Sequence, residues 1–394
     1  MQLLGLYISI PFCKSKCTYC NFASGVFPAS YFERYIERLE TDLRGIRARA
    51  VRWGAELSEC VDTIYLGGGT PSLLPAPLLR RIFEAIRHEF AIDADVEITL
   101  ECAPGQLGDE TLAAMVSCGV NRVSFGVQSF VDDEAKRTGR RHTRAVALRD
   151  AERVRQAGIG RVNLDLIAGL PGQTCASWHE SLEVLGTANP DHASIYMLEV
   201  DDDSRLGREV RSGGLKYYAP QVPADDATAE MYVEAAELLV ANGLPQYEIS
   251  NFARPGAESR HNRKYWLRRP YLGLGLDAHS MLRDTNGYAL RFATTDELEP
   301  FLDSAGWSEP QRLTRDEELE EAWFLGLRLN VGVSLAALRA EFGEDAVHRF
   351  KPAIAELASD GLLECADDRV RLTLRGRLLS NEAFARFLVE PVNA

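Results

Sequence analysis

The sequence predicts an α/β protein: a partial barrel of six β/α units, followed by a small C-terminal α+β module that resembles a winged helix. Three observations lead to this prediction. Up to about residue 200, short apolar runs rich in Val, Ile, Leu, Tyr and Phe alternate with amphipathic helical patterns. Most of the apolar runs end in Gly, Pro or polar residues, as strands do. Near the C-terminus, three helical patterns precede two short apolar segments.

The strands of the barrel are expected at six apolar runs. These are residues 6–10, 63–66, 96–100, 122–127, 162–167 and 193–198. Helical patterns separate them, for example at 31–49, 77–89, 143–157 and 175–186. Repeated β–α units imply a parallel sheet with right-handed crossovers. Six such units would form a partial barrel rather than a closed eight-stranded one, with ligands at the C-terminal ends of the strands.

The chain after residue 200 follows a different pattern. A helix is expected at 225–242, before a stretch rich in Gly and aromatic residues. Further helices are expected at 317–329, 335–342 and 346–360, and a hairpin at 361–364 and 370–373. We therefore divide the chain into a barrel (1–200), a barrel extension (201–305) and the C-terminal module (306–394). The helices of the module are acidic and lack a basic stripe, which favours a structural or protein-contact role over DNA binding.

Composition and charge narrow the class of protein. The 394 residues are 46% apolar and 26% charged, which is ordinary for a soluble globular protein. No apolar run is long enough to form a transmembrane segment, and the first residues resemble a strand rather than a signal peptide. We therefore expect a cytoplasmic protein. The net charge of −14 argues against broad, nonspecific binding of nucleic acid.

The densest group of reactive side chains follows the first predicted strand. Cys13, Cys17 and Cys20 have the spacing Cys-x3-Cys-x2-Cys. Three thiolates on one short loop can hold a soft metal or an iron–sulfur cluster. A 4Fe–4S cluster held by only three cysteines leaves one iron open for a substrate or cofactor. The loop is therefore the first candidate for a reactive centre.

The same three cysteines could instead be structural thiols, zinc ligands or disulfide partners. The other five cysteines show no CxxC pairing, which argues against a disulfide framework and for a reducing compartment. They are Cys60, Cys102, Cys118, Cys175 and Cys365, and each is expected to be a small buried hydrophobe. A structural zinc site needs four protein ligands, and no fourth Cys or His lies within the next few residues. The spacing favours a cluster and leaves zinc as the alternative.

The second predicted strand ends in Gly67-Gly68-Gly69-Thr70-Pro71. Because glycine has no Cβ, such a run lets a ligand approach the backbone, although a tight turn alone would also explain it. Thr70 adds a hydroxyl and Pro71 stiffens the exit. Close to the cysteine loop, the run is expected to bind the ammonium and carboxylate of a polar cofactor.

Polar or charged side chains also follow the next three predicted strands. Glu101 ends the third strand, where such a residue is commonly solvated or neutralised by a cation. Gln128 ends the fourth, and Arg140 follows a dozen residues later. Asp165 interrupts the apolar fifth strand, where a charge is costly unless it is paired or hydrogen-bonded. Its partners could be ligand hydroxyls or an arginine inside the barrel.

Together these motifs resemble the radical S-adenosylmethionine (SAM) superfamily. The cysteine loop followed by Gly-Gly-Gly-Thr-Pro carries the resemblance. Runs at 119–130, 165–174 and 247–253 are similar to one branch of it, the oxygen-independent coproporphyrinogen III oxidases and their heme-chaperone relatives of the HemW type. The match covers nearly the whole chain. It implies a partial (β/α)6 TIM-like barrel of the radical SAM type.

The resemblance implies two cofactors for the barrel. Cys13, Cys17 and Cys20 would hold a 4Fe–4S cluster, and SAM would fill the open iron. One electron from the cluster would cleave the sulfonium carbon–sulfur bond to give methionine and a 5′-deoxyadenosyl radical. The scaffold is therefore expected to be able to cleave SAM reductively.

The residues implied to surround SAM are those at the matching motif positions. They are Tyr7, Tyr19, Gly68, Gly69, Thr70, Glu101, Gln128, Arg140 and Asp165. The two glycines and the threonine would bind the amino end of SAM. The last four residues would position its carboxylate and ribose, and the tyrosines would lie beside it. Arg140 suits a carboxylate because its guanidinium is planar and always charged.

Within the branch, the resemblance separates oxidases from chaperones. Oxidases carry a fourth cysteine where this chain has Phe22, and a substantial extension before the cysteine loop, whereas this chain reaches Tyr7 at once. Chaperones carry His-Asn-x-x-Tyr-Trp, found here at 261–266. The resemblance thus implies a heme chaperone that binds the cluster, SAM and heme, delivers heme to apo-hemoproteins and lacks oxidase activity. The alternatives are an oxygen-independent coproporphyrinogen III oxidase and a HemN-like radical SAM methyltransferase.

The motif at 261–266 suggests how heme is bound. A neutral His261 imidazole could ligate the iron, the aromatic residues Tyr265 and Trp266 could pack on the macrocycle, and Arg263 or Lys264 could meet a propionate. Alternatively, His261 is a hydrogen-bonded structural residue of this loop. The expected partners are heme, recipient apo-hemoproteins, an electron donor such as a flavodoxin or ferredoxin, and peripherally contacted membrane hemoproteins, but no nucleic acid.

Three positions depart from the usual family pattern. Ser9 stands where a histidine is common, and Cys102-Ala103 replaces the small residue and asparagine of Glu-x-Asn-Pro-Gly. Leu276-Asp277 occupies positions of small residues. We expect Asp277 to be buried and to alter the substrate or heme pocket.

Overall fold

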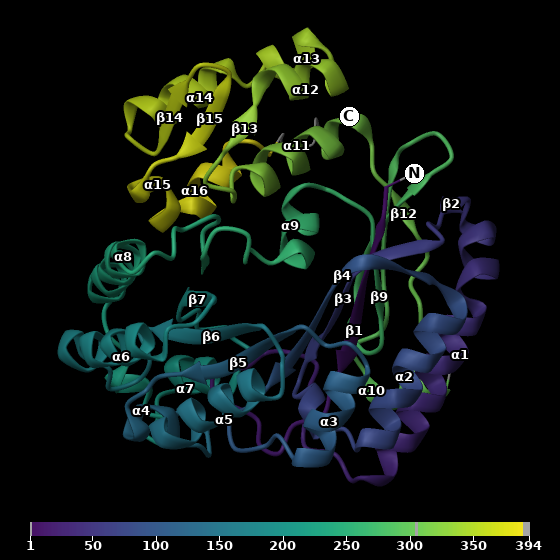
Figure 1. Cartoon of the computed structure of the whole chain (residues 1–394). Helices are drawn as coiled ribbons and strands as arrows, with labels where there is room; N and C mark the ends of the chain where they lie inside the picture. The colour runs from purple at the N-terminus through teal and green to yellow at the C-terminus, as the bar shows by residue number, and fades with distance from the viewer. Residues whose placement is uncertain (1, 304–305, 389–394) are drawn as a thin grey trace.

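One large sheet organises most of the chain (Figure 1). The computed structural model describes residues 2–303 and 306–388. Six parallel strands form the centre of the sheet in the order in which they occur in the chain. They are β1 (Leu4–Ile10), β3 (Cys60–Gly68), β4 (Ala91–Cys102), β5 (Arg122–Gln128), β6 (Arg161–Ala168) and β7 (His192–Met197). All six predicted strands are confirmed. Their apolar composition follows from burial on both faces, as in β1, where only Tyr7 is partly exposed.

The sheet continues beyond the central strands with elements that the sequence analysis missed. β9 (Tyr271–Leu274) adds parallel to β1, and the antiparallel strands β10 (His279–Asp284), β11 (Ala289–Ala293) and β12 (Gln311–Arg312) follow. β8 (Asn251–Ala253) closes the other side, antiparallel to β7, and β2 (Ala55–Glu56) pairs with β10. Because β1 and β7 have different neighbours rather than each other, the barrel is open. The predicted partial barrel is confirmed.

Helices connect the parallel strands and cover one side of the sheet (Figure 1). They are α1 (Ser30–Trp53), α2 (Ala76–Glu89), α3 (Asp109–Ser117), α4 (Asp132–Arg137), α5 (Arg144–Gln156) and α6 (Cys175–Ala188). Their ends follow local signals. α1 stops where Gly54 takes φ 65°, and α6 begins with a capping box between Thr174 and Ser177. α7 (Arg205–Ser212), α8 (Asp225–Ala241), α9 (Arg260–Trp266) and α10 (Leu298–Asp303) follow β7.

The C-terminal part builds a second, three-stranded sheet in the order β13-β15-β14. Its elements are α11 (Arg315–Gly326), β13 (Val333–Ser334), α12 (Leu335–Phe342), α13 (Glu344–His348), α14 (Lys351–Ser359), β14 (Leu363–Ala366), β15 (Arg369–Leu372), α15 (Leu374–Leu378) and α16 (Ser380–Ala385). The expected single helix at 346–360 is wrong: α13 ends at His348, and α14 begins at Lys351 with Pro352 in its first turn, where proline is tolerated. The winged-helix-like arrangement is confirmed. The chain division at residues 200 and 305 stays a prediction.

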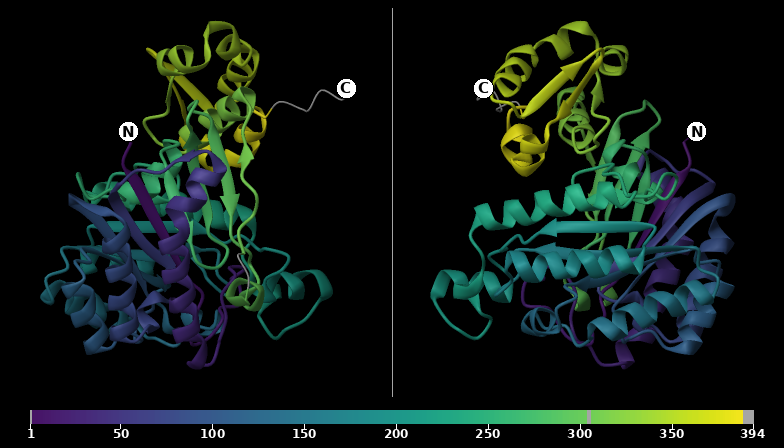
Figure 2. Two further views of the ribbon diagram at one scale, coloured as in Figure 1. Left: turned by 90° about the vertical axis from the view of Figure 1, so that its right-hand side faces the viewer. Right: turned by 60° about the vertical axis from the view of Figure 1, so that its left-hand side comes forward.

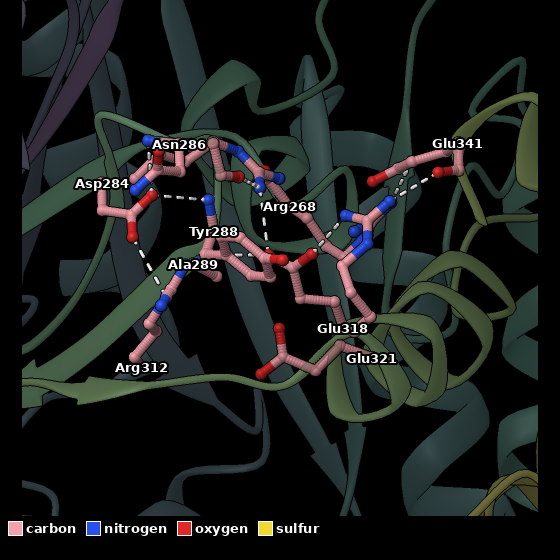
Figure 3. A network of polar contacts seen from close by, with 12 residues as sticks. Arg268, Asp284, Asn286, Tyr288, Ala289, Arg312, Glu318, Glu321 and Glu341 are labelled. Carbon is pink, nitrogen blue, oxygen red and sulfur yellow. Dashed lines mark hydrogen bonds and ion pairs between the residues drawn. The ribbon is translucent and has the colours of Figure 1, made fainter.

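The module has its own hydrophobic core and a polar connection to the barrel extension. Its core contains Trp323, Phe350 and Phe387, which pack together. The rings of Trp323 and Phe387 are stacked, with their centroids 4.7 Å apart. In Figures 1 and 2 this part lies at one end of the molecule, beyond α9 and α8. The fully buried Glu318 of α11 accepts a hydrogen bond from the Ala289 backbone N–H at 2.6 Å (Figure 3). Its other carboxylate oxygen accepts a hydrogen bond from Arg315 at 2.8 Å.

A neighbouring ion pair joins the same parts of the chain. Arg268, just after α9, lies 2.7 Å from Glu341 of α12 (Figure 3).

In 2–303 and 306–388 no helix combines the length and apolar character that crossing a membrane requires.

Candidate functional site

Two adjoining cavities open at the C-terminal ends of the central strands. The larger has a volume of about 1040 Å³ and the smaller about 460 Å³. Small-molecule sites typically have volumes of roughly 300–1,000 Å³. The smaller cavity lies within this range and the larger lies at its upper end. Phe22, Ser24, Gly68 and Glu101 line both cavities, so the two are neighbours.

The larger cavity contains most of the predicted site. Its lining includes Cys13, Cys17, Cys20, Tyr19, Gly68, Gly69, Thr70, Glu101, Gln128, Arg140 and Asp165. These residues come from the loop after β1 and from the ends of β3, β4, β5 and β6, with Arg140 between α4 and α5. Of the positions expected around the cluster and SAM, Tyr7 alone lies elsewhere, since it lines the smaller cavity. Parallel strands gather these side chains because their carboxyl ends meet at one edge.

The three cysteines of the loop are partly buried free thiols. Backbone hydrogen bonds hold the loop: Cys13 N–H donates to Gly25 at 2.8 Å, and Thr18 N–H donates to Thr138 at 3.1 Å. Burial raises the pKa of the Cys13 thiol, and the Thr70 hydroxyl lies 3.8 Å from its sulfur. Across 2–303 and 306–388, no three Cys, His, Asp or Glu side chains converge as a single metal ion requires. A cluster needs less convergence, because each thiolate binds a different iron.

The remaining cysteines only partly match the expectation that each is buried. Cys102 and Cys118 are buried and Cys60 is partly buried. Cys175 and Cys365 are exposed, so the expectation is wrong for them. Cys175 occupies the first position of α6, on the outer side of the barrel, where the turn points the side chain to solvent.

The glycine run is explained by close packing against the cysteine loop. A Cβ at Gly69 would lie 2.8 Å from the Ile10 carbonyl oxygen, and one at Gly68 would lie 2.9 Å from the Ser9 hydroxyl. The N–H groups of Gly69 and Thr70 donate to Ile10 and Phe12 at 2.8 Å each. The glycines therefore bring the end of β3 against the start of the cysteine loop, while Gly68 still lines both cavities.

Glu101 occupies the wall between the two cavities. Its carboxylate accepts a hydrogen bond from the Tyr65 hydroxyl at 2.8 Å. Burial, reinforced by the nearby charge of Asp165, raises the pKa of Glu101 to about 7. The side chain is partly exposed at the cavities and forms no ion pair with a cation among the described residues, so of the two ordinary expectations for a strand-end glutamate the ion pair is not met. It can therefore change charge near neutral pH.

Gln128 and Arg140 present polar atoms that the described residues leave unpartnered. Gln128 is buried and has φ 71°, where β5 breaks its pairing register with β6. Its Oε1 and the Nε of Arg140 are buried without a hydrogen-bond partner. Arg140 also donates to the Tyr19 hydroxyl at 3.4 Å. A Cβ at Gly126 would lie 2.8 Å from the guanidinium, so this glycine makes room for Arg140. Unpaired buried groups in a cavity fit a polar ligand.

Asp165 is held by uncharged neighbours. Ser124 donates to one carboxylate oxygen at 2.9 Å and Asn163 to the other at 2.7 Å. Burial raises the pKa of Asp165, while these hydrogen bonds and that from Ser194 lower it. The described residues therefore do not form the alternative, an ion pair between Asp165 and an arginine. Arg140 only lowers the pKa of Asp165 through its charge.

His261 matches the structural alternative in its present conformation. Its side chain is buried, 1% exposed, and lines neither cavity. Both ring nitrogens are engaged, Nδ1 with the Thr63 hydroxyl and Nε2 with the Tyr265 hydroxyl, each at 2.8 Å. Burial lowers the pKa of His261 to about 3, so the imidazole is neutral. Lys264 is also buried and paired with Asp62 at 2.7 Å, which rules it out as the expected propionate partner without rearrangement.

The smaller cavity has aromatic walls. Tyr7, Phe22, Tyr265, Trp266 and Tyr271 line it, together with Leu276 and Leu325. The two aromatic residues of the 261–266 motif thus face a cavity although its histidine does not. Ser9, Asp277, His279 and Arg291 supply polar groups.

The three departures from the family pattern have different surroundings. Asp277 is exposed, with φ 52°, so the expectation that it is buried is wrong: the left-handed turn before β10 directs it outward. Its carboxylate nevertheless lines the smaller cavity. Ser9 lines the same cavity, and the buried Cys102 lines the larger one.

Several lining residues were missed because they come from distant parts of the chain. Arg328 follows α11 and stacks over Trp266 at 4.3 Å. Residues 378–382, at the junction of α15 and α16, also line the larger cavity. No local motif marks these positions, since only the packing of the C-terminal part over the barrel places them there.

Comparisons with known proteins agree with this architecture. The family described as Radical SAM superfamily matches residues 7–185, and the family described as HemN C-terminal domain matches residues 313–379. A solved structure described as coproporphyrinogen III oxidase (HemN) from Escherichia coli, a radical SAM enzyme, has a TM-score of 0.83 and covers 98% of this chain and 90% of its own. Its 24% identity shows a shared fold alone.

Curated relatives match over almost their full length. The heme chaperone HemW of Bacillus subtilis (strain 168) is 33% identical over 390 residues, which cover 98% of this chain and 99% of that protein. The heme chaperone HemW of Escherichia coli (strain K12) is 34% identical over 395 residues, with 98% of each covered. Radical S-adenosyl methionine domain-containing protein 1, mitochondrial, of Mus musculus is 37% identical over 84% of this chain and 74% of its own length.

Proposed function

Since the chain belongs to the HemW-type heme chaperone family of the radical SAM superfamily, we propose that it binds heme and delivers it to apo-hemoproteins. A 4Fe–4S cluster and SAM would occupy the larger cavity. The radical SAM superfamily implies both of these cofactors. The observation that carries the proposal is the adjacency of the two cavities: the three cysteine thiols line one, and the aromatic residues of the 261–266 motif line the other.

The larger cavity has the donor set that the two implied cofactors need. Cys13, Cys17 and Cys20 would hold the cluster through their thiolates. When bound, the cluster supplies the electron that cleaves SAM reductively. Gly68, Gly69 and Thr70 would lie at the amino end of SAM, within the same lining.

The protein's own groups would orient SAM within this cavity. The unpartnered Nε of Arg140 and Oε1 of Gln128 offer a cationic donor and a neutral acceptor. Asp165, fixed by Ser124 and Asn163, offers carboxylate oxygens for ribose hydroxyls. The Tyr19 hydroxyl accepts a hydrogen bond from the Arg140 guanidinium at 3.4 Å and so would help to fix the guanidinium beside SAM.

The smaller cavity would hold the heme macrocycle. Its aromatic walls suit an extended apolar ring, and Arg291 is the cation among its described lining residues. Arg291 is already paired with Glu321 at 2.6 Å and bonded to the Tyr271 hydroxyl at 2.7 Å, which keeps this wall ordered. Glu101 and Phe22 line both cavities, so these two residues would contact both binding sites.

The test begins with anaerobic reconstitution by iron and sulfide, followed by titration with heme. We expect stoichiometric heme binding and transfer of heme to an apo-hemoprotein. A parallel assay adds coproporphyrinogen III, a reductant and SAM. Formation of protoporphyrinogen would instead make the protein an oxygen-independent oxidase, and methylation of an added substrate would make it a radical SAM methyltransferase.

The cluster assignment is tested separately by Cys17→Ser. The variant should lose the visible absorbance and most of the iron and sulfide of the reconstituted protein, because one of three thiolate ligands is gone. Cys175→Ser, which changes an exposed thiol on α6, is the matched control and should reconstitute fully. Retained iron and sulfide in Cys17→Ser would contradict the assignment.

A further inference from the structure

We propose that His279, rather than His261, is the histidine that ligates the iron of heme in the smaller cavity. The inference rests on the proposed heme-binding function and adds the identity of the ligand. It also assigns His261 a different task, that of a positioning residue for the aromatic wall.

The case against His261 as the ligand is geometric. To reach iron, its ring would have to leave the Thr63 and Tyr265 hydroxyls, both at 2.8 Å. Each of these buried hydrogen bonds stabilises the present position of the ring, and leaving the abandoned hydroxyls unpaired would cost still more. The ring would also have to move out of a site where 1% of the residue is exposed.

Among the seven histidines, His279 alone lines either cavity. His142, His192 and His261 are buried, and His192 is bonded through both ring nitrogens to Asn163 and Tyr247. His88, His179 and His348 are exposed but belong to α2, α6 and α13, away from the cavities. All seven lie in the described part of the chain, so the comparison is complete.

The imidazole of His279 is accessible while its backbone is fixed. The side chain is 74% exposed, and its nearest ionic partner is Asp277, 3.8 Å from Nε2. His279 is the first residue of β10 and pairs with Ala293 of β11. Just before it, the Ala278 N–H donates to the Thr294 hydroxyl at 2.8 Å. The side chain can therefore turn toward a ligand without any change in the sheet.

The turn that presents His279 is tightly packed. Gly275 has φ 96°, and a Cβ there would collide with the Ser9 carbonyl oxygen and the Tyr35 hydroxyl. The Tyr35 hydroxyl in turn accepts from the Leu276 N–H at 2.8 Å and donates to the Ser9 carbonyl oxygen at 2.7 Å. Such packing preorganises the position of the ligand backbone.

Asp277 supplies the carboxylate that commonly accompanies a metal-ligating histidine. Histidines that bind metals commonly place their other ring nitrogen near a carboxylate, which orients the ring and raises its basicity. Asp277 lies within ion-pair distance of one ring nitrogen of His279 and lines the same cavity. No hydrogen bond to a described residue fixes the ring, so the exposed imidazole can turn to donate a nitrogen lone pair to the iron while its other nitrogen faces Asp277.

His261 acts on heme through Tyr265 in this arrangement. Its Nε2 holds the Tyr265 hydroxyl at 2.8 Å, and the Tyr265 ring packs edge-on against Tyr271, with centroids 4.5 Å apart at 84°. Both tyrosines line the smaller cavity. Changing His261 should therefore loosen the aromatic wall and weaken heme binding while leaving the ligand on the iron.

The experiment compares ferric heme bound to the reconstituted full-length protein and its variants by electron paramagnetic resonance. The oxidised cluster is diamagnetic, so the signal reports the heme iron alone. His279→Ala should lose the histidine-ligated signal and bind heme about tenfold or more weakly. Added imidazole should restore the signal. His88→Ala, an equally exposed histidine on α2 at 80%, is the control and should match the wild type.

The other outcomes decide against the inference or against the function beneath it. If His279→Ala keeps the wild-type signal and His261→Ala loses it, His261 is the ligand and the inference falls. If both variants keep the signal, the ligand is not one of these histidines and the inference falls while heme binding stands. If the wild-type protein binds no heme, the proposed function itself fails. Thermal unfolding of each variant confirms that it is folded.

Discussion

At the scale of single residues, the site is defined by polar groups that the protein buries without fully satisfying. Glu101, Gln128 and Arg140 each pay a desolvation cost in the absence of a ligand. A carboxyl whose pKa lies near 7 and two buried polar atoms without hydrogen-bond partners, Oε1 of Gln128 and Nε of Arg140, come together at this barrel mouth. Perturbed and unpaired groups of this kind cluster where a ligand binds.

Glu101 should make stability depend on pH in one defined window. Its pKa rises from 4.5 to about 7 on folding, so between these values the folded protein holds a proton that the unfolded chain releases. The free energy of unfolding of the wild type should therefore fall with rising pH by about 1–3 kcal/mol relative to Glu101→Gln. Denaturant unfolding at pH 4.5 and 7.5 measures this. Parallel curves for wild type and Glu101→Gln would refute it, and the exposed Glu110→Gln serves as control.

Asp165 should contribute to SAM binding through a carboxylate already fixed in place. Asp165→Asn keeps the shape of the side chain but replaces one acceptor oxygen with an amide donor, so one of the hydrogen bonds from Ser124 and Asn163 is lost. The charge that would accept ribose hydroxyls is lost as well. Affinity for SAM by calorimetry should weaken by about 1.5–3 kcal/mol, the value of hydrogen bonds to charged groups. Cluster content and heme binding should not change. Unaltered affinity would remove Asp165 from the SAM site.

At the scale of elements, contacts between strand ends shape the cysteine loop. The N–H groups of Gly69 and Thr70 bind the start of the loop to the end of β3 through hydrogen bonds. The middle of the loop is hydrogen-bonded to Thr138. The loop itself is irregular, with no helix or strand between β1 and α1. The conformation of the three cysteines therefore depends on backbone contacts with distant segments, which cannot be predicted from the spacing of the cysteines.

Gly69→Ala tests this dependence. The added methyl would lie 2.8 Å from the Ile10 and 2.9 Å from the Phe12 carbonyl oxygens, which are backbone atoms that cannot turn aside. Overpacking of this kind costs about 1–3 kcal/mol. We expect lower stability and reduced iron incorporation on reconstitution. Gly45→Ala in α1, where nothing lies within 4 Å, should be neutral or stabilising. Full iron content in Gly69→Ala would show that the packing does not matter to the cluster.

At the scale of the whole molecule, the C-terminal part completes the cavities. Leu325 of α11 lines the smaller cavity, and residues 378–382 line the larger one. The module is fixed to the barrel extension by Glu318 and by the Arg268–Glu341 pair (Figure 3). The module thus contributes to the candidate site directly, in keeping with the expected structural role.

Glu318→Ala should loosen this attachment. Glu318 is fully buried between Arg283 and Arg315, and removing one member of a buried ion pair costs about 3–5 kcal/mol because the remaining charges lose their partner. We expect a lower unfolding temperature and faster hydrogen exchange in α11 and β11. Glu344→Ala breaks an exposed pair with Arg339 and should cost less than about 1 kcal/mol. Equal effects of the two variants would mean that the buried pair does not hold the module.

The sequence by itself determined the central strands, the cysteine loop and the strand-end residues around it. Period-two and continuous apolar runs report burial directly, and a parallel sheet necessarily brings the carboxyl ends of its strands together. For this reason Glu101, Gln128 and Asp165 could be placed at one cavity without coordinates. The family resemblance rested on these same local motifs.

Tertiary structure alone decided which side chains are free to act. The motif at 261–266 gave no sign that its histidine is buried between two hydroxyls, one of them on β3, about two hundred residues away in the chain. It also could not show that Asp277 and His279 are exposed, that two cysteines outside the loop face solvent, or that 378–382 reach the larger cavity. Exposure and hydrogen-bond partners arise from contacts between distant segments, and local sequence patterns do not encode those contacts.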